Sequence, residues 1–433
     1  MKAVSASIRP LRSAVAASSR RARPSSTSSP FAASCTRRRS LATEASPTQQ
    51  HPGPPPTTGY APLPNRSLIA VAGVDAPKFL QGLVTASVYQ QPPSPPDTPR
   101  GDGFYTAFLT AQGRVLHDAF VHPNPQHYGL SEAQARGLSP GCSFLVEVSR
   151  SQVDALFALM RRYKLRSKLV HRKVEPDEAF VYSYWNEAFS AANSGSGDVL
   201  PEDLSRIGPG AYVTRDSRAP DLGWRVVTGG EGKGLRVDAD ACPRKTYTVR
   251  RFLRGVAEGP GEIVPDKTLP LDANIDLMGG VDFRKGCYVG QELTIRTKHR
   301  GVVRKRILPC VVYADGEPRP TELEYNPTTP GALGTENVPS RTDIGPVSTS
   351  KKRPTGHWIN GIGNIGLAMC RLQPMTDIEL PGESADSPSP YDPETEFVLK
   401  WEAEGGQQLK VKPFVPDWIR EKIAQGAHSR PAQ

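Results

Sequence analysis

Short apolar runs bounded by glycine, proline and polar residues dominate the first half of the chain, and they predict β-strands. These strands are expected at residues 66–72, 104–109, 114–121, 143–148 and 170–174. Two other stretches, 76–84 and 151–164, repeat their apolar residues every three or four positions, which predicts helices. Asp75 is positioned to cap the first helix, and Ser151 with Asp154 resembles a capping box for the second.

The same pattern of strands and helix then returns. Strands are predicted at residues 180–184, 211–213 and 223–227, and a helix is predicted at 244–256. A polar stretch at 186–210, which contains glycine and serine, predicts a surface loop. Two α+β units in series indicate a duplicated two-layer architecture within residues 65–300.

After Gly301 the helical periodicity disappears. Apolar runs at residues 302–312, 362–372, 397–401 and 408–414 predict strands joined by long loops of proline, threonine, serine and glycine. We therefore expect a small all-β domain, a barrel, over residues 301–425, followed by a tail at 426–433.

Charge is distributed very unevenly along the 433 residues. Residues 1–43 contain nine Lys or Arg and no acid, so they account for nine of the ten net positive charges. Together with apolar residues at helical spacing, this composition is typical of a mitochondrial transit peptide. The Pro-rich residues 44–64 predict an extended linker. The remaining chain is nearly neutral and has no run of ~18 apolar residues, so neither a nucleic-acid partner nor a membrane span is expected.

The cysteines do not form a self-contained framework. Outside the leader they are scattered, odd in number and free of CxxC pairs: Cys142, Cys242, Cys287, Cys310 and Cys370. Neither a set of disulfides nor a zinc or iron–sulfur site within one chain fits this spacing. A metal held by Cys287 would need ligands from distant residues or from another molecule.

Cys287 stands out because cationic residues and glycines surround it. Arg284 and Lys285 precede it, and positive neighbours favour a thiolate, which would be a nucleophile or a soft-metal ligand. Gly286 and Gly290 allow a tight turn. Residues 291–298 predict a short helix whose N-terminus would lower the thiol pKa further. The alternative interpretation is a buried cysteine in a glycine-bent connection.

The sequence Lys285-Gly286-Cys287-Tyr288-x-Gly290-Gln291-Glu292 resembles the signature of the YgfZ-type branch of the aminomethyltransferase-like, folate-binding superfamily. Further matching motifs occur in the same order: Phe79-Leu80-Gln81-Gly82-Leu83-x-Thr85, Leu109-x-x-x-Gly113-Arg114-Val115-Leu116-x-Asp118, Arg251-x-x-x-Gly255, Leu269-Pro270, Arg296 and Arg300-Gly301. The resemblance covers residues 64–312 well and the terminal β region loosely. It implies an α+β fold in which two α+β subdomains and a C-terminal β-barrel form a ring around a folate-sized cavity.

With a mitochondrial leader, the resemblance implies a matrix factor that helps to mature [4Fe–4S] proteins, such as aconitase-type enzymes and lipoate synthase, together with A-type iron–sulfur scaffold proteins. Cys287 would be the functional thiol and a ligand to a cluster shared with the scaffold. Tetrahydrofolate is the other cofactor that the resemblance implies. The residues expected to contact a cofactor or to shape its loop are Lys285, Asp118, Gln291, Glu292 and Arg296.

Two alternatives remain open from the sequence. The first is a tetrahydrofolate-dependent aminomethyl- or methyltransferase, in which Asp118 would hold the pterin or steer a proton. Such enzymes resemble this fold but usually have adjacent acids where this chain has His117-Asp118. The second is a non-catalytic adaptor that uses the fold only as a docking surface.

Overall fold

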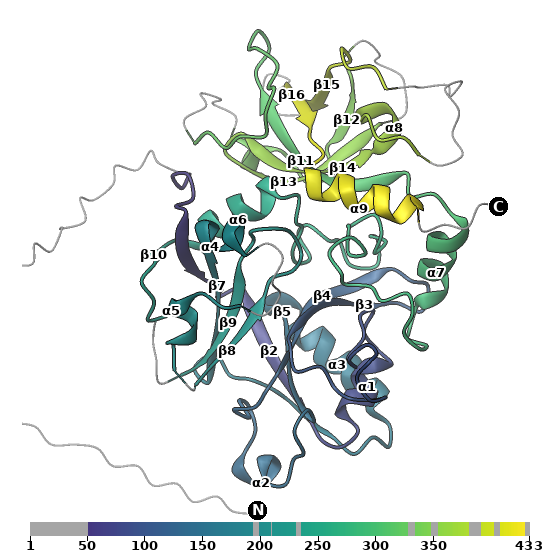
Figure 1. Cartoon of the computed structure of the whole chain (residues 1–433). Coiled ribbons are helices and arrows are strands. Elements are labelled where there is room, and N and C mark those ends of the chain that lie inside the picture. Colours follow the sequence, from purple (N-terminus) through teal and green to yellow (C-terminus); the bar gives the residue numbers. More distant parts are fainter. Residues whose placement is uncertain are drawn as a thin grey trace, which may run out of the picture. The chain divides into compact units, whose positions relative to one another are not determined.

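The computed structural model describes residues 51–193, 199–208, 210–230, 235–327, 334–347, 354–380, 391–401 and 408–428 (Figure 1). The predicted transit peptide at 1–43 lies outside these residues. The described elements form two five-stranded sheets and a closed six-stranded barrel. The predicted combination of two α+β subdomains with a C-terminal barrel is therefore confirmed.

The first sheet has the strand order β3-β4-β5-β2-β6, and all of its pairings are antiparallel. Every strand predicted for this region is present. The elements are β2 (Arg66–Ala72), β3 (Phe104–Leu109), β4 (Val115–Pro123), β5 (Ser143–Ser149), β6 (Val170–Lys173), α1 (Ala76–Gln81), α2 (Glu132–Ala135), the 3₁₀ turn η1 (Arg150–Gln152) and α3 (Val153–Lys164).

Both helix starts differ from the predicted capping. Asp75 is at the N-cap of α1, but its carboxylate accepts a hydrogen bond from the Lys168 backbone N–H (2.6 Å) instead of capping the helix. At α3 the N-cap is Gln152, because η1 precedes the helix, and the Ser151 hydroxyl bonds with Ser149. Contacts with neighbouring segments thus replace the local capping bonds that the sequence favours.

The second sheet has the order β10-β1-β7-β9-β8. Residues Thr58–Pro62 form β1 of this sheet, so the chain departs from the expected linker at that point. The predicted loop at 186–210 was wrong in part, because it contains two short helices. The elements are β1 (Thr58–Pro62), β7 (Ala179–Asn186), β8 (Ala211–Arg215), β9 (Trp224–Gly229), β10 (Asp240–Ala241), α4 (Glu187–Ala192), α5 (Glu202–Ser205) and α6 (Arg244–Leu253).

The C-terminal strands close into a barrel in the order β11-β14-β13-β12-β15-β16 (Figure 1). The sequence predicted four of these strands but not β12 and β13, whose glycines and prolines interrupt the alternation, and not the helix α9. The elements are β11 (Lys305–Tyr313), β12 (Asp343–Pro346), β13 (Gly356–Ile362), β14 (Ile365–Arg371), β15 (Phe397–Lys400), β16 (Gln408–Pro413), the 3₁₀ turn η2 (Thr335–Asn337), α8 (Leu372–Met375), α9 (Asp417–His428) and, before the barrel, α7 (Gln291–Arg300).

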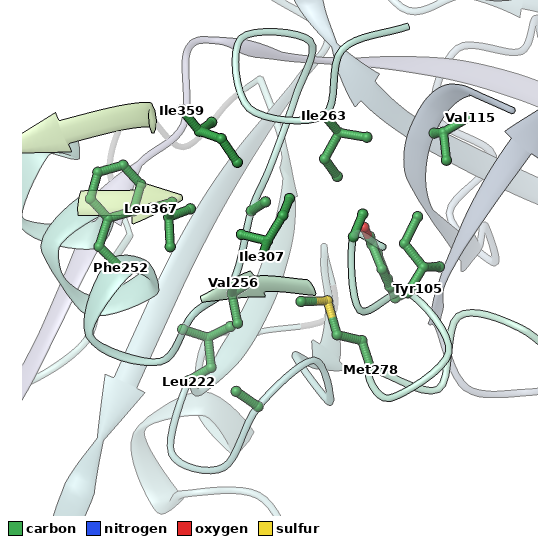
Figure 2. Close-up of a cluster of buried hydrophobic side chains, with 14 of the residues drawn as sticks. Tyr105, Val115, Leu222, Phe252, Val256, Ile263, Met278, Ile307, Ile359 and Leu367 are labelled. Carbon is green, nitrogen blue, oxygen red and sulfur yellow. The ribbon is translucent and has the colours of Figure 1, made fainter. Parts of the chain in front are cut away.

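An irregular segment between α6 and α7 joins the three parts. Its backbone bonds with β4, where Asp266 N–H donates to Val115 O, and with the barrel, where Ile307 N–H donates to Asp272 O. Figure 2 shows the largest shared core, in which Tyr105 of β3, Phe252 of α6 and Leu367 of β14 belong to one buried cluster. The segment that leads to Cys287 is therefore supported by both the first sheet and the barrel.

Within the part of the chain that the structure describes, none of the helices is both long enough and apolar enough to cross a bilayer.

Candidate functional site

Cys287 lies in the loop that connects the irregular segment with α7. Its side chain is exposed, whereas Cys310 and Cys370 are buried in the barrel and the other two cysteines of the described chain are half-buried. The alternative of a buried cysteine in a glycine-bent turn is therefore wrong. An exposed thiol can be reached by another protein or by a metal ion without any opening of the fold.

Lys285 fixes the base of this loop. Its Nζ donates hydrogen bonds to three backbone oxygens, those of Gln81 (2.8 Å), Val84 (2.6 Å) and Ala86 (2.9 Å), and it lies 5.0 Å from the ring centre of Tyr288. Three bonds use all three N–H groups of an ammonium. Burial lowers the pKa of Lys285 to about 7. The geometry thus assigns this cation to joining the thiol loop to the turn after α1.

Two close contacts hold the other end of the loop. Val289 N–H donates to Gly82 O (3.1 Å), and Gly290 begins α7 with φ of +80°. A Cβ atom at Gly290 would lie 2.1 Å from Thr110 O, and one at Gly113 would lie 2.9 Å from Gly290 O. Glycine at 290 is therefore required both by its left-handed backbone and by the hairpin turn packed against it.

The helix predicted after the thiol is present as α7 (Gln291–Arg300), two residues longer than expected. The Gln291 side chain accepts a bond from Tyr288 N–H (3.2 Å), so it stabilises the loop as the sequence suggested. Glu292 and Arg296 are exposed one turn apart on this helix. Three of the predicted site residues therefore lie with Cys287 and Lys285 in one continuous segment.

Asp118 lies elsewhere, in a buried network of charges between the two sheets. Its side chain is 2% exposed, one oxygen accepts the Gly259 N–H (3.0 Å), and the other lies 3.7 Å from the Arg66 guanidinium. His117 beside it is also buried, and burial lowers the pKa of this imidazole.

The network contains residues that sequence reasoning missed. Glu147 of β5 accepts a bond from Arg66 Nε (2.6 Å) and bonds with His122 (3.1 Å). Burial alone would raise the pKa of Glu147, but the Arg225 and Arg66 guanidinium groups hold it far below its usual range. The available sequence signal was a single charged residue inside an otherwise apolar strand, as at Glu147 in 143–148. Further buried members of the network are Arg218, Asp216, Tyr247, Glu258, Arg251 and Glu262.

Tetrahydrofolate does not fit a site made from the five predicted contact residues. Asp118 is sealed in the charge network and already faces Arg66, whereas Glu292 and Arg296 point to solvent from α7. A pterin needs convergent polar groups around one cavity. The three N–H groups of Lys285 are also committed to backbone oxygens.

A polar cavity of about 580 Å³ lies beside the thiol loop. One wall is formed by the Pro-rich insertion after Val88, including Gln91 and Arg100, and the other by residues that lead to Cys287, including Asp282 and Arg284. Gln91 donates to Asp282 across it (2.9 Å). None of the five predicted contact residues lines this cavity.

The fold and its barrel match known proteins. Residues 304–421 match the family model described as the C-terminal β-barrel domain of CAF17. The glycine cleavage system aminomethyltransferase T of Bartonella henselae has a similar structure, with a TM-score of 0.52, 13% identity, and coverage of 84% of this chain and 86% of that one. The chain thus has the aminomethyltransferase-like fold of the folate-binding class.

Curated relatives define the family more closely. Mitochondrial iron–sulfur cluster assembly factor IBA57 homologs from Pyricularia oryzae and Aspergillus fumigatus are each 44% identical to the chain. The first match covers 85% of this chain and 86% of the relative, and the second covers 87% and 85%. The homolog from Neurospora crassa is 41% identical, with 84% and 81% covered. The chain therefore belongs to the IBA57 family of mitochondrial iron–sulfur cluster assembly factors.

Proposed function

We propose that this chain acts in the mitochondrial matrix as an iron–sulfur cluster assembly factor and that Cys287 is its working group. The observation that carries the proposal is the exposed thiol in a loop anchored at Lys285 and Gly290. Such a thiol keeps a fixed position while another protein approaches it. Family membership and the basic leader agree with this role.

In this role the cluster is cargo and not a resident cofactor. The Cys287 thiol would release its proton to solvent, and the resulting thiolate would donate an electron pair to an iron atom of a cluster that an A-type scaffold protein also holds. Sulfur ligands of this kind are those that iron–sulfur clusters prefer. The cargo would then pass to [4Fe–4S] clients, such as aconitase-type enzymes and lipoate synthase-type radical enzymes.

The transferase alternative receives no support from Asp118, because that carboxylate is sealed inside the charge network. The adaptor alternative differs from the proposal in one respect, since it requires docking but not the thiol. An experiment on Cys287 therefore separates the two.

The test is anaerobic reconstitution of the chain with an A-type scaffold, iron and sulfide, followed by visible absorption and Mössbauer spectroscopy. Wild type should form a complex that contains a cluster, and Cys287→Ala should lose nearly all of the shared cluster because one ligand is missing. Cys142→Ala is the matched control, since Cys142 is a half-buried thiol outside the loop. In cells that lack the protein, Cys287→Ala should fail to restore aconitase activity, and full restoration at normal expression would overturn the proposal.

A further inference from the structure

Positive charge is concentrated around the exposed thiol. Residues 284–305 contain seven Lys or Arg and one Glu, although the chain after residue 43 has a net charge of only about +1. The remainder of that chain is therefore net negative. Such an asymmetric distribution orients and accelerates the approach of an oppositely charged partner.

Three of these cations are available for a partner. Arg284, Arg296 and Arg300 are exposed, and no described residue forms a hydrogen bond or ion pair with any of their side chains. Arg296 and Arg300 are four residues apart in α7, so they lie on one face of the helix. By contrast, the buried Arg66 is paired with Glu147. The free cations near Cys287 are therefore not used to stabilise the fold.

Gly286 adds an independent observation. A Cβ atom at this position would meet no heavy atom within 4 Å, and its φ lies outside the left-handed range. Neither the packing nor the backbone of the chain itself therefore requires glycine beside Cys287. A missing side chain also lets another main chain approach closely, and that reason would lie in a partner.

We propose that Arg284, Gly286, Cys287, Arg296 and Arg300 form a basic docking surface for an acidic face of the protein that carries the cluster. The partner's main chain would pass next to Gly286, and its carboxylates would meet the three guanidinium groups. This inference rests on the proposed function, because it names the surface of the partner that shares cargo with Cys287.

A folded acidic protein fits this surface better than a nucleic acid or a lipid bilayer. The α7 helix has ten residues, which is about 15 Å of helix, and the rest of the folded chain is net negative. A long polyanion or an anionic membrane would extend beyond the basic docking surface and meet like charge, whose repulsion acts over about 10 Å at 0.1 M salt. A compact acidic patch meets only the cations.

Charge reversal tests the surface. Binding to a mitochondrial A-type scaffold protein should be measured anaerobically by calorimetry at 0.05 and 0.5 M NaCl. We expect Arg296→Glu with Arg300→Glu to weaken binding about tenfold or more at low salt, with a smaller difference at high salt. Arg136→Glu with Arg244→Glu is the matched control, because both residues are exposed and the change in net charge is identical.

Gly286→Val tests the close approach of the partner. This variant should unfold at the same denaturant concentration as wild type but bind the scaffold at least several-fold more weakly. Gly261→Val is the control, because a Cβ atom there also meets nothing within 4 Å and the backbone is not left-handed. Unchanged binding of Gly286→Val would remove the glycine from the surface.

The outcomes separate this inference from the proposed function. If Cys287→Ala still binds the cluster-free scaffold in a salt-dependent way, docking by charge is supported even if the cluster is lost. Equal binding of the Arg296→Glu/Arg300→Glu variant and its control overturns the inference and leaves the role of Cys287 intact. It is also overturned if a single-stranded RNA, or vesicles of phosphatidylcholine with phosphatidylserine, bind as tightly as the scaffold and lose binding in the same variant.

Discussion

At the scale of single residues, a cation next to the thiol proves to be a structural anchor. Lys285 is adjacent to Gly286 and Cys287 in the chain, and proximity in sequence suggested that it would act on the thiol or on a cofactor. Instead its ammonium group bonds with three backbone oxygens of the turn after α1. Buried carbonyl groups without a donor are costly, so this side chain stabilises the loop that presents Cys287.

Replacing Lys285 should therefore destabilise the protein. We expect Lys285→Met to lower the free energy of unfolding by about 3 kcal/mol, because three buried carbonyl oxygens lose a charged donor. Urea denaturation monitored by circular dichroism measures this change. Lys298→Met removes the same charge nearby but only a cation–π contact with Phe283, so a change of about 0.5 kcal/mol is expected. Equal effects of the two variants would contradict the anchoring role.

The same lysine predicts a dependence of stability on pH. Burial lowers the pKa of Lys285 to about 7 from its ordinary value of 10.5, so between these values the unfolded chain binds one proton more than the folded one. The free energy of unfolding contributed by this group should then rise as the pH increases from about 7. Urea titrations at several pH values should give a difference between wild type and Lys285→Met that grows in favour of wild type. A difference independent of pH would argue against a lowered pKa.

At the scale of elements, the position of α7 depends on the hairpin between β3 and β4. The turn at Gly113 packs directly on Gly290, which is the N-cap of α7. The two glycines are far apart in the sequence but leave no room for a side chain between them. The hairpin therefore sets where the helix starts and where the preceding thiol loop lies.

Gly290→Ala should disturb this junction. Its Cβ atom would lie 2.1 Å from Thr110 O, and the backbone has φ of +80°, so we expect a loss of about 2 kcal/mol or more in unfolding free energy. Hydrogen exchange should rise in α7 and in the hairpin. Gly286→Ala, in the same loop but in open space, should be nearly neutral. If both variants were equally stable, the contact between hairpin and helix would not control the junction.

At the scale of the whole molecule, buried charges join the two sheets. Arg66 of β2 and Glu147 of β5 belong to the first sheet, and Arg225 of β9 belongs to the second. Glu258 from the irregular segment pairs with both Arg225 and Arg218. The cations hold the pKa of Glu258 well below its usual range although burial alone would raise it. The sheets are therefore joined by groups that must remain ionised.

This network predicts sensitivity to acid. The pKa values of Glu147 and Glu258 are lowered in the folded state, so their stabilisation is complete above about pH 4.5 and is lost as the pH falls below it. Denaturation between pH 7 and 3 should show this loss. Glu147→Gln should be destabilised by about 3 kcal/mol at pH 7, because Arg66 and Arg225 lose their counter-charge, and its stability should fall less steeply with acid. An identical acid dependence would contradict this role of Glu147.

The local elements were largely predictable because their signals are contained in a few neighbouring residues. The run Arg66–Ala72 is β2 with the predicted bounds, and α7 starts at the predicted Gln291. Helix caps were less predictable: the Asp75 carboxylate bonds with Lys168, a partner that no local pattern reveals. The strands β12 and β13 escaped prediction because pairing within the barrel, rather than their own alternation, makes them strands.

The sequence alone determined the α+β order with a terminal β-domain, the basic leader, the scattered cysteines and the signature that contains Cys287, since each of these is a property of composition or of short spacing. Only the tertiary structure decided that Cys287 is exposed, that Lys285 is an anchor and that Asp118 belongs to a buried charge network. The physical reason is that exposure and hydrogen-bond partners depend on segments distant in the chain, such as residues 81–86 for Lys285 and 259 for Asp118.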